Sequence, residues 1–217
     1  MLIIGITGSI ASGKSYLAAS LKQRLTKAYL FDADFEVRKL ITFDQAIIAR
    51  INHNFFPQAA PDAPIQRKKL ADMVFKKADK LALLENIIYQ PLRQKLALKI
   101  KVAFRKRINF LLLDIPLLFE NRLDKICHMT ILSEAPIKIR RQRFLARSGN
   151  QAQLFLLINQ RQLAQSKKIK QSDWAIKTSL GKARNHRALM QLVTKLNNFH
   201  ESQGNCLRHR NYWLKNQ

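Results

Sequence analysis

The segment from residue 8 to residue 15 could bind the phosphates of a nucleotide. It reads GSIASGKS, which fits the pattern GxxxxGK[ST], and it lies between an apolar run of strand type and a segment of helical spacing. In such a loop the glycines let backbone N–H groups surround a β-phosphate, the lysine reaches the β and γ oxygens, and the hydroxyl binds Mg²⁺. The alternative is a tight turn with an unrelated lysine. The predicted ligands of the phosphates are Gly8, Ala11, Ser12, Gly13, Lys14 and Ser15, and Ser15 is the predicted ligand of Mg²⁺.

Aspartates follow two further apolar runs. Asp32 and Asp34 come just after residues 28–31, and Asp114 ends the run 110–114, where an acid that organises Mg²⁺ often lies. If the first two strands are neighbours in space, Asp32 and Asp34 lie beside the phosphate-binding loop. A carboxylate there could take the proton of an acceptor hydroxyl or hold Mg²⁺ through water. Either aspartate could instead only cap the helix that begins near Phe35. Asp32 and Asp34 are therefore the candidate acids of a catalytic site.

The basic segment 138–147 is predicted to be a helix. Arg143 and Arg147 are four residues apart and therefore share a face, which Arg140 joins at three residues before Arg143. If this face lay over the phosphate-binding loop, its guanidinium groups would neutralise the charge of a phosphoryl group during transfer. The alternative is an ordinary solvated basic helix.

Apolar runs and helical periodicity predict an α/β fold. Strand-like runs occupy residues 2–7, 28–31, 110–114, 128–132 and 174–176, a helix is expected at 16–28, and residues 36–107 are mainly helical around a loop at 56–64. A closing helix runs to about residue 200, and residues 201–217 are interpreted as a basic tail. A strand, a helix and a strand within some thirty residues form a βαβ unit, so we expect a parallel sheet with its site at the carboxyl ends of the strands.

Composition excludes several classes of protein. The chain has 217 residues, 47% of them hydrophobic, which excludes a wholly disordered chain and suits one globular domain with an inserted lobe or lid. The longest apolar stretch, 110–119, is about half of a membrane helix, no signal peptide is recognisable, and two isolated cysteines exclude a disulfide framework. We therefore expect a cytoplasmic protein without a membrane partner.

The charge of the chain is strongly positive. Its 39 Lys+Arg against 14 Asp+Glu give a formal net charge of +25. One interpretation is an anionic partner such as nucleic acid, a membrane surface or polyphosphate. The other is a solvated basic surface, which the dispersed cations and the lack of interleaved aromatic residues favour. Charge alone assigns no function.

Taken together, the motifs resemble the dephospho-coenzyme A kinase family over nearly the whole chain. The resemblance rests on the loop GSIASGKS, DAD at 32–34, QRKKL at 66–70, LENII at 84–88 and DIPLLFE at 114–120, with Gln162 and Asp173 fitting downstream. The DIPLLFE segment is far more diagnostic than the phosphate-binding loop, which many kinases share. The family phosphorylates the 3′-hydroxyl of dephospho-CoA with ATP and Mg²⁺, giving coenzyme A and ADP in the last step of coenzyme A biosynthesis.

The resemblance also implies a fold and a set of residue roles. The fold is a three-layer P-loop NTPase kinase core with a parallel five-stranded sheet (about 1–35, 108–135 and 172–200), a helical lobe for the CoA substrate (36–107) and a lid (138–171), within a domain of residues 1–200 followed by the tail 201–217. We expect a monomer that needs no nucleic acid. Asp34 is the implied general base, with Asp32 as the other candidate, Lys14 and Arg143 act on the transferring group, and Arg147 is a lid arginine that contacts ATP. The residues implied to line the acceptor site are Pro116, Leu117, Leu118 and Glu120.

The chain departs from the family pattern at three places. Tyr16 stands where a threonine hydroxyl commonly meets the α-phosphate, and its phenol is expected to contact phosphate instead. Tyr89-Gln90-Pro91 replaces a His-Pro pair, and Lys177-Thr178 replaces acidic or amide residues. Two alternative functions remain at this point. One is a kinase for another small molecule or nucleotide, against which DIPLLFE argues, and the other is an ATP-controlled nucleic-acid-binding protein, suggested by the charge of +25.

Overall fold

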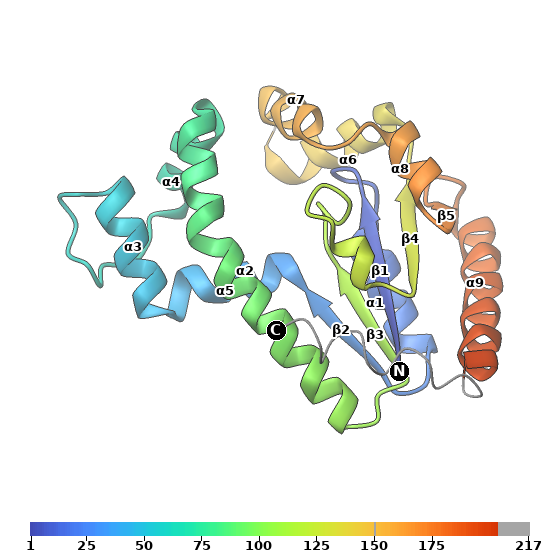
Figure 1. Cartoon of the computed structure of the whole chain (residues 1–217). Coiled ribbons are helices and arrows are strands. Elements are labelled where there is room, and N and C mark those ends of the chain that lie inside the picture. Colours follow the sequence, from blue (N-terminus) through green and yellow to red (C-terminus); the bar gives the residue numbers. More distant parts are fainter. Residues whose placement is uncertain (150, 204–217) are drawn as a thin grey trace.

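The computed structural model describes residues 1–149 and 151–203 and is built around a parallel sheet. In the order β2-β3-β1-β4-β5, the five strands lie side by side (Figure 1). This confirms the parallel five-stranded sheet, and every observed strand overlaps its predicted range. The central strands are apolar without alternation because both faces of the sheet are covered. The strands are β1 (Leu2–Gly8), β2 (Ala28–Asp32), β3 (Phe110–Asp114), β4 (Met129–Glu134) and β5 (Trp174–Lys177).

Helices cover the sheet on both faces and complete three layers. On one face, α1 (Lys14–Arg24) and α9 (Lys182–Gln203) bury Leu21 and Leu192 against strand residues such as Ile4 and Ile6. On the other face, α5 (Ala78–Arg105) and the segment after β3 bury Leu96 against Leu111 and its neighbours. That segment includes the short 3-10 helix η1 (Leu123–Ile126). The predicted three-layer α/β core is confirmed.

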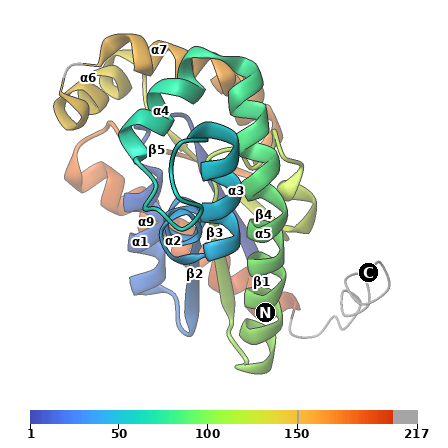
Figure 2. The same ribbon diagram turned by 90° about the vertical axis from the view of Figure 1, so that its left-hand side faces the viewer.

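A third apolar cluster lies beyond the β2 edge of the sheet, where α3 and α4 stand out to one side in Figure 1 and lie in front of the sheet in Figure 2. It joins α2 (Ala33–Phe43), α3 (Gln45–Phe55), α4 (Arg67–Lys76) and the first half of α5. Asn52 of α3 fixes the loop that follows, because its amide donates to the carbonyls of Ala60, Pro61 and Ala63 at 2.8 to 3.1 Å. The helical content and the loop at 56–64 are as predicted, whereas the boundaries of core, lobe and lid stay predictions.

Three short helices lie near the carboxyl ends of β1 and β4 (Figure 1). They are α6 (Ile137–Ser148), α7 (Ala152–Arg161) and α8 (Gln165–Gln171). Two predicted bounds are wrong: α1 begins at Lys14 and ends at Arg24 instead of spanning 16–28, and residues 201–203 belong to α9, not to the tail. The rest of the predicted tail, 204–217, lies outside the described residues. Within the described part, no helix is long and apolar enough to cross a membrane.

Candidate active site

The loop between β1 and α1 has the shape of a phosphate cradle. Ala11 and Gly13 adopt left-handed backbone conformations with φ of 58° and 95°. Gly13 precedes α1 and has no side chain to cap it, so the first N–H groups of the helix stay available for an anion. A Cβ on Gly8 would overlap Ser12 Oγ and lie 2.8 Å from the carbonyl of Ser133 in β4. Glycine at position 8 therefore allows the loop to lie directly against the sheet.

Asp114 lies beside this loop and contacts its last two residues, Lys14 and Ser15. Lys14 forms an ion pair with Asp114, whose side chain is only 1% exposed at the end of β3. Burial raises the pKa of Asp114, and the Lys14 charge and the hydrogen bonds from Lys14 and Ser15 offset part of this rise. The premise that the first two strands are neighbours is wrong, because β3 lies between β1 and β2, and the pairing of β2 with β3 sets Asp32 opposite Asp114. Hydroxyl and carboxylate oxygens are the ligands that Mg²⁺ prefers, so this set of side chains fits a magnesium ion held next to a nucleotide.

The two candidate bases differ in their surroundings. Asp32 Oδ1 accepts the N–H of Phe35 at 2.9 Å and so caps α2. Helix capping is the alternative to a catalytic role that the sequence left open for this residue. Asp34 lies in the first turn of α2 and is exposed, and within the described residues its carboxylate has no hydrogen bond or ion pair. Both oxygens of Asp34 are therefore open to an incoming hydroxyl, whereas one oxygen of Asp32 is occupied.

The arginines of α6 do not all face the phosphate loop. Arg143 donates to the carbonyls of Ser12 at 3.3 Å and Thr178 at 2.9 Å and so reaches the loop. Arg140 is buried and is held by other partners, with Nε on the Ala135 carbonyl at 3.1 Å and Nη1 on Asn159 Oδ1 at 2.8 Å. The prediction that Arg140 shares the face of Arg143 over the loop is wrong, because helical spacing does not fix which neighbour each side chain meets. Arg147 and Tyr16 are exposed, and in the described structure neither has a hydrogen bond to the loop.

The segment Pro116–Glu120 begins beside the end of the strand that leads into the phosphate loop. Thr7, at the end of β1, donates its hydroxyl to the Pro116 carbonyl at 3.1 Å. Pro116 and Leu117 are half-buried. Leu118 does not fit the predicted role of lining an acceptor site, because its side chain is fully buried against Gly5. Glu120 forms an ion pair with Lys168 of α8 at 2.9 Å. We name residues 116–120 the acceptor loop.

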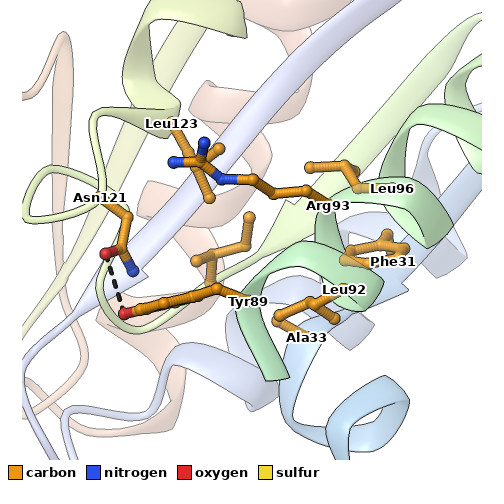
Figure 3. Close-up of a pocket in the computed structure, with 9 residues that line it drawn as sticks. Phe31, Ala33, Tyr89, Leu92, Arg93, Leu96, Asn121 and Leu123 are labelled. Atoms are coloured by element: carbon orange, nitrogen blue, oxygen red, sulfur yellow. Dashed lines mark hydrogen bonds between the residues drawn. The ribbon is translucent and has the colours of Figure 1, made fainter. Parts of the chain in front are cut away.

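A small apolar cavity lies between α5 and the chain that follows β3 (Figure 3). Its wall includes Ala33, which separates the two candidate bases. The Tyr89 hydroxyl donates to Asn121 Oδ1 at 2.9 Å across the cavity, joining α5 to the chain after the acceptor loop. Burial raises the pKa of Tyr89. The cavity is lined by Phe31, Ala33, Tyr89, Leu92, Arg93, Leu96, Ile115, Asn121 and Leu123.

Sequence reasoning did not assign a role to Thr178, which joins four parts of the site. Its hydroxyl contacts the Ser12 carbonyl, and its backbone N–H donates to the Glu134 carbonyl at 2.8 Å. Its own carbonyl accepts from Arg143 and, at 3.1 Å, from Asn185 of α9. The only feature of the sequence that pointed to Thr178 was the departure from the family pattern at Lys177-Thr178. Thr178 therefore holds Arg143 against the phosphate loop.

Known proteins match this chain along most of its length. A family model described as dephospho-CoA kinase covers residues 2–183. A dephospho-CoA kinase of Bartonella quintana is 32% identical over 196 residues, which are 90% of this chain and 98% of the relative. A dephospho-CoA kinase of Rhodospirillum rubrum is 34% identical over 193 residues, which are 89% of this chain and 90% of the relative.

A solved structure agrees with the sequence matches. The crystal structure of a Thermus thermophilus protein superimposes with a TM-score of 0.67 at 30% identity, and the match covers 90% of this chain and 97% of that one. The phosphate loop, the acids beside it and the acceptor loop all lie inside the matched residues. The chain therefore belongs to the dephospho-CoA kinase family.

Proposed function

We propose that the protein transfers the γ-phosphoryl group of ATP to the 3′-hydroxyl of dephospho-CoA, giving coenzyme A and ADP. The observation that carries this proposal is the placement of two loops. The phosphate loop would hold the donor, and the two loops leave the sheet at neighbouring strand ends: Thr7, just before the phosphate loop, donates to the Pro116 carbonyl, and Lys14 pairs with Asp114, two residues before the acceptor loop. A kinase needs its two substrates at this kind of junction, because phosphoryl transfer depends mainly on positioning and charge stabilisation.

On the donor side, the chain supplies positive charge where negative charge develops. Lys14 would leave Asp114 for the β and γ oxygens of ATP, and Arg143, held by Thr178 at the loop, would stabilise the nucleotide from the lid side. Ser15 and Asp114 would hold Mg²⁺, directly or through water, and the ion would neutralise charge on the same oxygens. The loop is shaped by Gly8, Ala11, Ser12 and Gly13. We place the exposed side chains of Tyr16 and Arg147 at its outer rim.

On the acceptor side, we assign the general base to Asp34. Its free carboxylate takes the proton of the 3′-hydroxyl while the hydroxyl oxygen bonds to the γ-phosphorus and the bond to the β,γ-bridging oxygen breaks. Asp32 holds the start of α2 through its cap on Phe35 and adds charge beside Asp114. Pro116, Leu117 and the cavity around Tyr89 are the surfaces that we assign to the acceptor.

A direct assay tests the proposal. The purified full-length protein is given ATP and Mg²⁺ with and without dephospho-CoA, and ADP and coenzyme A are followed by coupled assay and mass spectrometry. We expect equal amounts of ADP and coenzyme A only when dephospho-CoA is present, with adenosine and AMP as unproductive acceptors and no stimulation by added RNA. Phosphorylation of a different acceptor, or ADP release without coenzyme A, would contradict it. The cytoplasmic location and monomeric state stay predictions from the sequence.

A further inference from the structure

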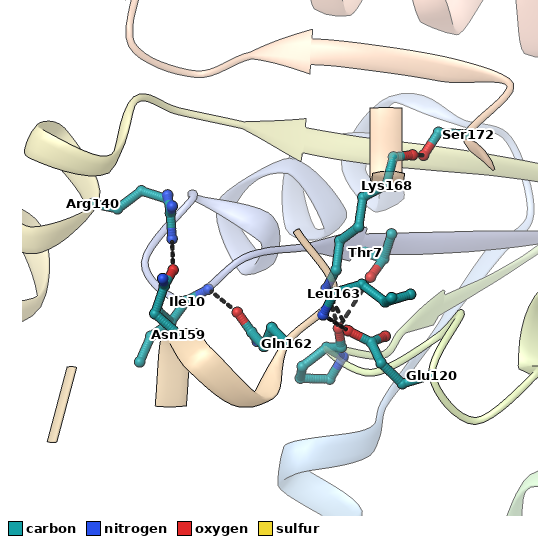
Figure 4. A network of polar contacts seen from close by, with 10 residues as sticks. Thr7, Ile10, Glu120, Arg140, Asn159, Gln162, Leu163, Lys168 and Ser172 are labelled. Atoms are coloured by element: carbon teal, nitrogen blue, oxygen red, sulfur yellow. Dashed lines mark hydrogen bonds and ion pairs between the residues drawn. The ribbon is translucent and has the colours of Figure 1, made fainter. Parts of the chain in front are cut away.

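Lys168 on α8 is a completely buried cation in a network of polar contacts (Figure 4). Its side chain is 0% exposed, and its Nζ lies 2.9 Å from Glu120 Oε1 and 3.4 Å from the Pro116 carbonyl. Burial lowers the pKa of Lys168, and the hydrogen bond to Glu120 offsets part of that effect. Taking an ammonium out of water costs several kcal/mol unless it is paired and hydrogen-bonded. The contacts of Lys168 therefore need an explanation beyond packing.

Both partners of the Lys168 ammonium group are ends of the acceptor loop. Pro116 is its first residue and Glu120 its last, so one ammonium group fixes the two ends at once. The Pro116 carbonyl also accepts the hydroxyl of Thr7, which lies at the end of β1 just before the phosphate loop. Lys168 of α8 and Thr7 of β1 thus both donate to the Pro116 carbonyl (Figure 4).

The chain just before α8 continues the same network to the phosphate loop. Glu120 Oε1 also accepts the backbone N–H of Leu163 at 2.8 Å. The neighbouring side chain, Gln162, accepts the N–H of Ile10 in the phosphate loop at 2.8 Å. The stretch from Gln162 to Lys168 therefore binds the phosphate loop at one end and the acceptor loop at the other.

We propose that Lys168 is a positioning residue for phosphoryl transfer, which sets the acceptor loop at a fixed distance from the phosphate loop. The inference rests on the proposed function, and it assigns Lys168 no contact with either substrate. Because the Lys168 ammonium contacts the acceptor loop, loss of these contacts disturbs the placement of dephospho-CoA more than the binding of ATP. A misplacement of about 1 Å can lower a rate by about 10²-fold.

The test compares two lysines of the same helix. In Lys168→Met, we expect kcat/KM for dephospho-CoA to fall by about 10²-fold, through both a higher KM and a lower kcat, while the Kd of ATP changes by less than about threefold. Lys168→Arg, which keeps the charge and the donors, recovers part of this loss. Lys170→Met is the matched control, because Lys170 is exposed on α8, and it keeps the wild-type kinetics.

A double variant separates positioning from stability. Lys168→Met alone leaves Glu120 without its cation and lowers the Tm, whereas Glu120→Gln combined with Lys168→Met removes both charges and restores much of the Tm. Positioning predicts that kcat/KM stays low in the double variant. Recovery of kcat/KM together with the Tm, an equal loss of ATP affinity, or wild-type kinetics in Lys168→Met would overturn the role of Lys168 alone. A wild-type protein that makes no coenzyme A would instead overturn the proposed function, and the inference with it.

Discussion

Asp34→Asn is the substitution that most directly tests the assignment of the general base. Asparagine has nearly the same shape as aspartate but cannot take a proton from the 3′-hydroxyl. Asp34 is exposed in the first turn of α2, and within the described structure its carboxylate has no partner to lose. We therefore expect a loss of catalysis without a loss of folding.

The exposure and the contacts of the two aspartates set the expected magnitudes. Loss of a general base lowers kcat by about 10²- to 10⁴-fold. An exposed substitution changes the free energy of unfolding by no more than about 0.5 kcal/mol, which is a shift in Tm of about 1–2 °C for a chain of this size. Asp32 gives the opposite pattern: Asp32→Ala removes the cap on Phe35 and costs about 1 kcal/mol, or about 2–4 °C, whereas Asp32→Asn keeps a good cap.

The assay measures kcat by ADP release with saturating ATP and dephospho-CoA, the Kd of ATP by calorimetry, and the Tm by circular dichroism. Asp34→Asn should keep the Kd of ATP and the Tm and lose kcat. Asp32→Asn should keep kcat and the Kd of ATP to within a few fold and leave the Tm nearly unchanged. If Asp32→Asn abolishes transfer while Asp34→Asn remains active, the assignment of the base is reversed.

Three further substitutions test other contacts. Lys14→Ala should raise the Kd of ATP at least about tenfold, about 1.4 kcal/mol, and also lower kcat, and an unchanged Kd in calorimetry would exclude a phosphate contact. Tyr89→Phe removes the 2.9 Å hydrogen bond to Asn121, worth about 1 kcal/mol, and should raise KM for dephospho-CoA about fivefold in steady-state kinetics; an unchanged KM would make this bond purely structural. Gly5→Ala places a methyl group 2.7 Å from Leu118 Cδ2 and should lower the free energy of unfolding in urea by about 1–3 kcal/mol, whereas wild-type stability would show that Leu118 repacks freely.

The parts of the site that are local in sequence were predictable. The phosphate loop, from Gly8 to Ser15, is one continuous segment whose glycines and lysine lie at set spacings, and the structure gives it the expected shape. Asp114 was expected at the end of a strand, where an acid that organises Mg²⁺ often lies, and its ion pair with Lys14 places it beside the loop.

Contacts between distant segments were not predictable from periodicity. The Tyr89–Asn121 hydrogen bond spans 32 residues, and the contact of Thr178 with Ser12 spans 166. Helical spacing put Arg140 and Arg143 on one face, but packing sent Arg140 to Ala135 and only Arg143 to the loop. A pattern states which residues share an element, whereas the tertiary neighbours of each side chain depend on how the elements pack.

The distribution of ion pairs has a consequence for how substrates arrive. Among the side chains that the structure describes there are two ion pairs, Lys14 with Asp114 and Lys168 with Glu120, and both lie in or beside the site. With 39 cations and 14 acids in the chain, positive charge dominates the field around the molecule. ATP and dephospho-CoA are both anions, so this field draws them in over a distance of about 10 Å at 0.1 M salt, the Debye length. Capture of both substrates therefore slows as ionic strength rises, while the same salt relieves the mutual repulsion of the surface cations.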